Sequence, residues 1–228
     1  TFQVIVLWRA IMDETLAGRL ESILPGGRGV WIPMDHGVSS FPELGLEKTE
    51  AAVDAAIKGG ADAIVLHKGA VSYHSERTGW GRFVCHVSAS TVHGGKNSQN
   101  KVIVANALEC LGRGAIGISA QVNLGIESEK EMIHGLGTVT SQAHECNLPV
   151  LGMLYPRGPN LALDPSDLTG GVAHAARIAW ELGCHVVKVP WTGSIESFRI
   201  VTSSVPIPVL ISGGQTTSFL DLLDIVEK

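Results

Sequence analysis

The segment GGVAHAARIAWELGCHVVKVPWTG, residues 170–193, contains the pattern that decides the fold. Alanine, valine and isoleucine recur at helical spacing through 170–183 until a glycine stops the helix, and an apolar, β-branched run follows at 184–193. A helix that leads into such an apolar strand is typical of a parallel sheet covered by helices on both faces. One lysine, Lys188, interrupts the run, and the cost of burying its charge demands an explanation.

The same unit of strand, glycine- or proline-containing turn and helix repeats along the chain. The pattern predicts strands at 29–37, 62–69, 82–91, 115–125, 148–158, 184–193 and 207–214, and helices at 46–60, 100–114, 129–147, 170–183 and 218–228. A polar, glycine-rich loop is expected between the second and third strands. Seven or eight such units favour a (β/α)8-type barrel, the TIM barrel, over an open doubly wound sheet. With no linker or low-complexity segment, residues 1–228 are expected to form one domain.

The eighth unit of the barrel has no counterpart in this pattern. A closed barrel needs eight strands, and the repeat ends with the helix after the seventh. Either the eighth unit is truncated, or an unusual element closes the barrel. The stretch FQVIVLW at 2–8 is a candidate strand, although its position before the first repeat argues against it. An open barrel has two unpaired edges, so we expect either poor order near residues 210–228 or an edge that another segment or subunit covers. Phosphate binding is then expected to be weak.

Composition excludes several classes of function. The net charge is −5, and no basic run with interleaved aromatic residues is present, so a nucleic-acid partner is not expected. Cys85, Cys110, Cys146 and Cys184 lack the spacing of a zinc site and predict free thiols in a reducing compartment. No stretch approaches the roughly 18 apolar residues of a membrane span, and no signal peptide is evident. We therefore expect a soluble, cytoplasmic protein without a membrane partner.

Polar side chains follow nearly every predicted strand. Because active sites of barrels lie at the carboxyl ends of the strands, this arrangement predicts a site there. The residues concerned are Asp35, His36, His67, Lys68, His86, Ser88, Gln121, Asn123, Tyr155, Arg157, Lys188, Ser212, Gly213 and Gly214.

Lys188 has three interpretations. It could form a structural ion pair, contact a phosphate, or act as a nucleophile whose desolvated amine attacks a carbonyl to form a Schiff base. Tyr155 and Asp35 favour the nucleophile, because Schiff-base chemistry needs a proton donor to expel water and a carboxylate to move protons. Each also has a structural alternative, since Asp35 could cap a turn and Tyr155 could simply pack.

The other polar strand ends suggest substrate binding. The backbone N–H groups of Ser212-Gly213-Gly214, before a predicted helix, suit a phosphate, although a tight turn would use the same residues. We group them with other residues expected to bind substrate or phosphate: His36, Lys68 and Arg157. The histidines at 36, 67 and 86 lack the spacing of metal ligands, so no metal is expected.

Together, PMDHGVS, LHKG, MLYPRG, VVKVPWTG and SGG resemble the archaeal-type class I aldolase family over about residues 27–214. Finer features, including VNLG and TGSIESFR, are most similar to its heptulosonate synthase branch. Two positions depart from the family pattern: Gln121 stands where histidine is usual, and Trp191 where tyrosine is usual. The eighth strand of the family, whose Gly-Arg pair completes the phosphate grip, has no counterpart.

The resemblance implies that Lys188 forms the Schiff base, Tyr155 is the general acid and base, and Asp35 is a second proton-transfer residue. Gly213 and Gly214 would bind the substrate phosphate. The implied reaction transfers carbon from a phosphorylated ketose to an aldehyde acceptor, L-aspartate semialdehyde in that branch, in a homo-oligomeric enzyme without a cofactor. Fructose-bisphosphate aldolase, a thiolase-like acyl transferase and a non-catalytic barrel remain as alternatives.

Overall fold

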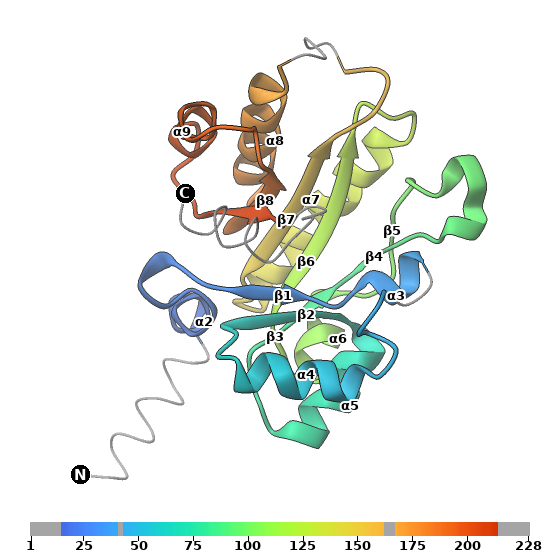
Figure 1. The fold of residues 1–228 in the computed structure, drawn as a ribbon, viewed down its shortest axis with the longest axis vertical. Helices are drawn as coiled ribbons and strands as arrows, with labels where there is room; N and C mark the ends of the chain where they lie inside the picture. Colours follow the sequence, from blue (N-terminus) through green and yellow to red (C-terminus); the bar gives the residue numbers. More distant parts are fainter. Residues whose placement is uncertain (1–14, 41–42, 162–166, 214–228) are drawn as a thin grey trace.

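The computed structural model describes residues 15–40, 43–161 and 167–213. Seven parallel strands form one sheet within them, in the order β1-β2-β3-β6-β7-β8-β9 (Figure 1). Their bounds are β1 Trp31–Pro33, β2 Ala63–His67, β3 Phe83–His86, β6 Ala115–Leu124, β7 Val150–Pro156, β8 Val186–Pro190 and β9 Val209–Ser212. Each strand of the sheet pairs with the next one along the chain, as in a barrel.

Helices follow most strands and cover the outer face of the curved sheet (Figure 1). They are α4 Thr49–Lys58, α5 Lys68–Thr78, α6 Ala107–Gly112, α7 Glu129–Glu145, α8 Thr169–Glu181 and α9 Ile195–Ser203. Among the described residues, no strand joins β9 to β1, and the sheet contains seven of the eight strands of a barrel. This confirms the predicted fold class. The stretches 2–8 and 218–228, on which two further predictions rest, lie outside the described residues.

The two faces of the sheet carry separate apolar clusters, because side chains alternate along each strand. The outer cluster packs under the helices and includes Ile64, Ile118 and Val187. The inner cluster includes Val65 and Met153. Lys188 therefore points to the inner side, since it lies between outward-facing valines.

A helix before the first strand closes the amino end of the barrel interior. Helix α2 (Leu16–Ile23) is followed by the short helix η1 (Pro25–Gly27) and inserts Ile23, which is fully buried, into the inner cluster. Arg19 donates to the carbonyl oxygens of Cys146 and Asn147, at 2.9 and 3.0 Å, just before β7. This plug leaves only the carboxyl ends of the strands for a site that faces the interior.

The predicted helix at 100–114 is wrong in its first half. Residues Val102–Ile103 form β5, which pairs antiparallel with β4 (Ser88–Ala89), and α6 begins only after the cap residue Asn106. The β-branched residues favour a strand once a partner is available. The predicted strand 82–91 is correspondingly divided between β3 and β4, and the helix η2 (Val92–Asn97) follows.

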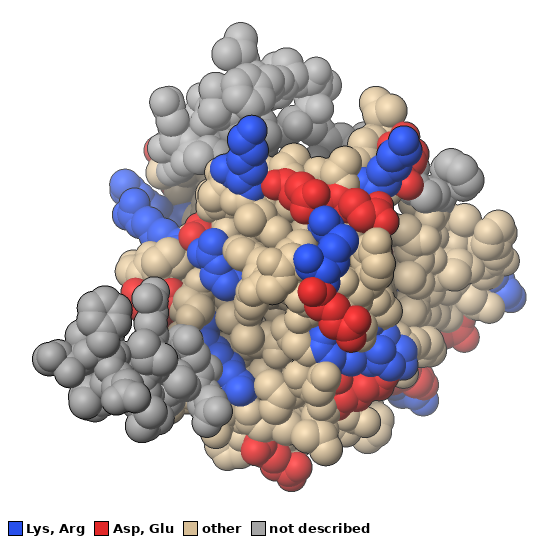
Figure 2. All heavy atoms as spheres, turned by 90° about the horizontal axis from the view of Figure 1, so that it is seen from below, with Lys and Arg blue, Asp and Glu red and all other residues tan. Residues whose placement is uncertain are grey.

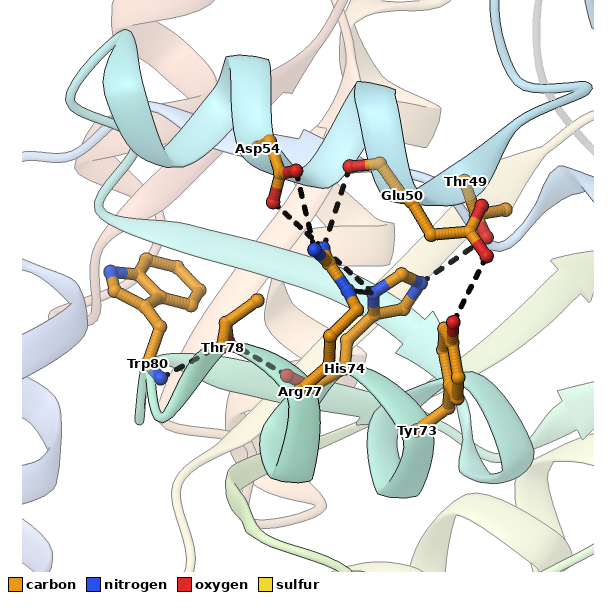
Figure 3. Close-up of polar contacts among 8 residues, drawn as sticks. All are labelled: Thr49, Glu50, Asp54, Tyr73, His74, Arg77, Thr78 and Trp80. Atoms are coloured by element: carbon orange, nitrogen blue, oxygen red, sulfur yellow. Dashed lines mark hydrogen bonds and ion pairs between the residues drawn. The ribbon is translucent and has the colours of Figure 1, made fainter.

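The loop expected between the second and third strands is a helix, α5, and α2 and α9 were also not predicted. Helix α5 has little amphipathic pattern, so periodicity gave no signal. Its polar side chains instead find partners on α4: Tyr73 donates to Glu50, and Arg77 pairs with Asp54 at 2.8 Å (Figure 3). Tertiary contacts thus outweigh the weak local preference.

Charges of both signs are interspersed on the face seen from below in Figure 1. Figure 2 shows lysine and arginine beside aspartate and glutamate across the coloured part of this face, without an extended area of one sign. In the part of the chain that the structure describes, no helix combines the length and apolarity needed to cross a bilayer.

Candidate active site

A cavity of about 310 Å³ opens at the carboxyl ends of the strands. Its walls come from β6, β7 and β8, from the short helix α3 (His36–Ser39), and from η2 and the residues that follow it. Several lining side chains can carry charge: Asp35, His36, Lys101, Tyr155, Arg157 and Lys188. The fold thus brings reactive groups together from segments that are far apart in the sequence.

Lys188 lies on the inner face of β8, opposite Met153 of β7. Burial lowers the pKa of its amine below the ordinary value of a lysine, although the charge of Asp35 opposes this shift. Among the described residues, none forms a hydrogen bond or an ion pair with the amine. A larger fraction of Lys188 is therefore neutral near pH 7 than for an exposed lysine, and its nitrogen is free to react.

Tyr155 shares this inner face, two residues beyond Met153 on β7. Burial raises the pKa of its phenol to about 12, so the hydroxyl is protonated at neutral pH. The guanidinium of Arg157 lies over the ring, 4.1 Å from its centroid, and a hydrogen bond with Ser212 reaches the hydroxyl. Both interactions favour the phenolate, so Tyr155 can donate a proton and later take it back.

Asp35 follows β1 and is largely buried, which by itself would raise the pKa of its carboxyl group. The imidazoles of His86 and His36, a backbone hydrogen bond and Lys188 outweigh burial, and the pKa is lowered. His86 Nε2 is 3.7 Å from the carboxylate, and His86 Nδ1 lies 2.9 Å from the hydroxyl oxygen of Ser119. Because burial lowers the pKa of His86 to about 4, Asp35 is a carboxylate beside a neutral imidazole at pH 7.

The structure brings most of the predicted site residues to this cavity. Lys188, Tyr155, Asp35, His36 and Arg157 line it. Ser212 ends β9 and reaches Tyr155, while the exposed Gly213 follows it directly. Gly214 lies outside the described residues. The roles assigned to all these residues remain predictions.

Lys68 is not among the residues that line the cavity, and Ser212 and Gly213 are not among them either. Lys68 begins α5, and its ammonium donates to the carbonyl oxygen of Val104 at 2.8 Å and pairs with Glu109 at 3.2 Å. Its charge is therefore balanced within the protein.

Sequence reasoning missed Lys101, which lines the cavity and donates to Ser39 Oγ at 3.1 Å. It lay in the segment interpreted as a helix, so no strand-end signal marked it. Gln121, which the sequence marked as a polar strand end and as a departure from the family pattern, also lines the cavity, and its amide donates to Asn123 Oδ1 at 2.9 Å. No three histidine, cysteine or acidic side chains within the described ranges are grouped as metal ligands; the expected absence of a metal stays a prediction.

Comparison with known proteins identifies the family. Residues 30–228 match the DeoC/LacD family aldolase. The chain is 35% identical, over 210 residues, to 2-amino-3,7-dideoxy-D-threo-hept-6-ulosonate synthase 1 of Archaeoglobus fulgidus, covering 92% of this chain and 76% of that protein. It is also 35% identical to 2-amino-4,5-dihydroxy-6-oxo-7-(phosphonooxy)heptanoate synthase of Streptomyces griseus, with coverages of 82% and 68%.

Solved structures agree with this assignment. An archaeal fructose-1,6-bisphosphate aldolase, whose catalytic lysine is bound to the carbinolamine intermediate, superposes with a TM-score of 0.80 at 25% identity, covering 93% of this chain and 86% of that one. Fructose-bisphosphate aldolase from Slackia heliotrinireducens superposes with a TM-score of 0.82 at 20% identity, covering 95% of this chain and 75% of that chain. At this identity the comparison supports the fold alone. The chain belongs to the DeoC/LacD aldolase family and is an enzyme of the class I aldolase and transaldolase type.

Proposed function

We propose that this enzyme forms a Schiff base between Lys188 and a phosphorylated ketose and transfers the resulting carbon unit to an aldehyde. The proposed acceptor is L-aspartate semialdehyde, as in 2-amino-3,7-dideoxy-D-threo-hept-6-ulosonate synthase. One observation carries the proposal: the amine of Lys188 has a lowered pKa and no hydrogen-bond partner among the described residues, and it shares a cavity with Tyr155 and Asp35. A cytoplasmic, single-domain homo-oligomer belongs to the same proposal.

The first step uses the neutral amine. Lys188 attacks the ketone carbon of the donor to give a carbinolamine, and the hydroxyl of that intermediate must leave as water. Tyr155 is suited to supply the proton, because a phenol with a pKa of about 12 is protonated at neutral pH. Arg157, stacked on the phenol ring, stabilises the negative charge that develops on the oxygen.

Carbon–carbon cleavage follows from the iminium ion. A base removes the proton from the hydroxyl group two carbons from the iminium carbon, and the carbon–carbon bond between them breaks. The carbon that carried the hydroxyl leaves as an aldehyde, and the electrons of the bond pass to the iminium nitrogen to give an enamine. Asp35 is the proposed base or its partner, because its lowered pKa keeps it ionised near neutral pH. The enamine then attacks the carbonyl carbon of the acceptor, and hydrolysis of the new iminium returns Lys188.

The remaining predicted residues are assigned to binding. Gly213 and Gly214 would hold the donor phosphate with Ser212, and His36 and Arg157 would contact the substrate from the cavity wall. Lys68 is retained only as a weaker candidate, because Glu109 already balances its charge.

A second candidate is fructose-bisphosphate aldolase, which would use the same machinery. The structural superposition on the archaeal enzyme favours it, whereas the higher identity to the two heptanoate and heptulosonate synthases favours the first candidate.

The test combines borohydride trapping with a product assay. Reduction in the presence of a panel of ketose phosphates should leave a substrate adduct whose mass identifies the donor, located on Lys188 by peptide mapping. Product formation is then compared with and without L-aspartate semialdehyde. A new amino-keto acid that requires this acceptor supports the synthase. Release of glyceraldehyde 3-phosphate from fructose 1,6-bisphosphate at a higher rate favours the second candidate, and no adduct on any lysine would refute both.

A further inference from the structure

The residues before and after Lys101 in the sequence are hydrogen-bonded to neighbouring strands. The next residue, Val102, pairs with Ala89 in the β4–β5 ribbon, which lies beside α3 (Figure 1). Two residues earlier, the carbonyl oxygen of Gln99 accepts a hydrogen bond from Asn123 of β6 at 2.7 Å. The backbone on each side of Lys101 is therefore held by a neighbouring strand, and its side chain lies in the wall of the cavity.

The ammonium of Lys101 is incompletely neutralised. It donates to Ser39 Oγ at 3.1 Å, and none of the described carboxylates forms an ion pair with it. Asp35 acts on it only at longer range. Burial lowers the pKa of Lys101, and the nearby guanidinium of Arg157 lowers it further.

Arg157 is in a similar position. Its guanidinium stacks on Tyr155, whose phenol is uncharged at neutral pH, and none of the described carboxylates forms an ion pair with it. Lys101 and Arg157 are two partly buried cations that repel each other. Asp35 is the only carboxylate among the described residues that line the cavity, so positive charge is left unbalanced. Formation of an iminium on Lys188 would add another positive charge. A negatively charged group of the substrate would balance the charges of Lys101, Arg157 and the iminium ion.

We propose that Lys101, together with Arg157, forms an anion subsite that binds the terminal carboxylate or phosphate of the acceptor aldehyde. This inference rests on the proposed function of the cavity. The donor phosphate is assigned to the end of β9, whereas Lys101 comes from the segment between β3 and β6, so the two anionic ends of the joined carbon chain have separate sets of ligands. The pair would select acceptors that carry a negative charge and would orient them toward the enamine on Lys188.

The test compares charged and neutral acceptors. With dihydroxyacetone phosphate as donor, kcat/KM is measured for D-glyceraldehyde 3-phosphate, L-aspartate semialdehyde and uncharged D-glyceraldehyde. Lys101→Met should reduce the preference for each charged acceptor over glyceraldehyde by roughly 10- to 100-fold, the scale of one charge-assisted hydrogen bond. Lys101→Arg should restore most of it. The matched control is Lys96→Met, which removes an exposed lysine of the same segment and should leave the preference unchanged.

The two charged acceptors separate the two sources of the anion. Loss of preference for the semialdehyde alone assigns the subsite to a carboxylate, loss for the phosphate alone assigns it to a phosphate, and loss for both supports a general anion site. An equal fall in kcat/KM for all three acceptors would overturn the inference, because it would indicate a role in folding or in chemistry. Failure of Lys101→Met to form the adduct with dihydroxyacetone phosphate would also overturn it, by placing Lys101 at the donor.

A binding measurement separates this inference from the proposed function. If the wild-type enzyme gives no adduct with any ketose phosphate of the panel, the proposed function fails. Calorimetric titration with glycerol 3-phosphate then tests the subsite without turnover. Affinity that falls by roughly 10-fold or more in Lys101→Met, but not in Lys96→Met, retains the anion site, and equal affinity in the three proteins refutes it.

Discussion

The cavity at the strand ends and the polar network between α4 and α5 are built from similar side chains but differ in how their charges are satisfied. In the network, His74 is fully buried, Arg77 donates to it at 3.3 Å, and Thr49 lies 3.2 Å from its other nitrogen (Figure 3). Arg77 also pairs with Asp54 at 2.8 Å. The charges of this network are therefore balanced by groups of the protein itself.

In the cavity, Lys188 lacks a hydrogen-bond partner among the described residues, and Lys101 has only a serine hydroxyl. Asp35 faces a histidine that is neutral at pH 7. Because unbalanced buried charge destabilises a protein, such a cluster is retained where a ligand completes it. The balanced network joins two helices, and the unbalanced cluster is where substrate chemistry is expected.

The largest expected effect that tests this difference is the loss of Lys188. Lys188→Met should abolish both the borohydride adduct and turnover, since removing a covalent nucleophile costs on the order of 10⁶-fold in rate. Lys188→Arg should behave in the same way, because a guanidinium remains protonated and forms no imine. Mass spectrometry after reduction is the measurement.

The matched control for this prediction is Lys68→Met, which removes a lysine whose charge is already balanced outside the cavity. It should retain the adduct on Lys188. An adduct on Lys68 or Lys101 in the wild-type enzyme, or one that persists in Lys188→Met, would show that the nucleophile is assigned incorrectly.

The second prediction concerns Tyr155. Tyr155→Phe keeps the ring under Arg157 but removes the proton, so turnover should fall by roughly 10²–10⁴-fold, the usual scale for a positioned acid or base. The carbinolamine should still form, because Lys188 is untouched, but its dehydration to the imine should be slow without the proton of Tyr155. Single-turnover kinetics with trapping at successive times separate imine formation from cleavage. Unchanged turnover would exclude Tyr155 from proton transfer.

The third prediction uses the pH dependence of stability. Burial lowers the pKa of His86 from 6.5 to about 4 in the folded protein, so between these values the unfolded chain binds a proton that the folded chain does not. Stability should therefore fall as the pH decreases through this window, and His86 alone would account for about 3 kcal/mol.

Urea unfolding at pH 7 and pH 5 measures this effect, with His86→Gln as the comparison. The variant should lose less stability between the two pH values than the wild type. An equal loss in both proteins would show that His86 titrates normally.

The sequence predicted the site where local pattern and fold agree. Lys188 could be placed in the barrel interior because valines alternate with it along one strand, and Tyr155 and Asp35 because they end two other strands. Strand periodicity and the position of active sites in barrels are sufficient for such residues.

The sequence failed where a distant partner decides the local structure. Lys101 was missed because Val102–Ile103 becomes a strand only through pairing with β4. Helix α5 was missed because its polar residues depend on α4 rather than on an apolar stripe. The plug formed by α2 was missed because Ile23 packs inside the barrel against residues of strands that come much later in the chain. None of these signals is local.

The smallest expected effect belongs to the balanced network. His74→Phe fills a similar volume but leaves the hydroxyl of Thr49 and the guanidinium of Arg77 each without one hydrogen bond. Unfolding free energy should fall by about 1–3 kcal/mol, since donors or acceptors at a buried site lose a partner. Arg77 keeps its contact with Asp54, which limits the loss.

At the same time kcat/KM should stay within about twofold of the wild type once the folded fraction is equal, because a shift of less than about 0.4 kcal/mol is expected at a site with no contact to this network. Denaturant unfolding and steady-state kinetics on one preparation measure both quantities. A loss of catalysis larger than the loss of folded protein would mean that α4 and α5 are coupled to the cavity. The connection would run through His67, which ends β2 directly before α5 begins. The division between the two regions would then be wrong.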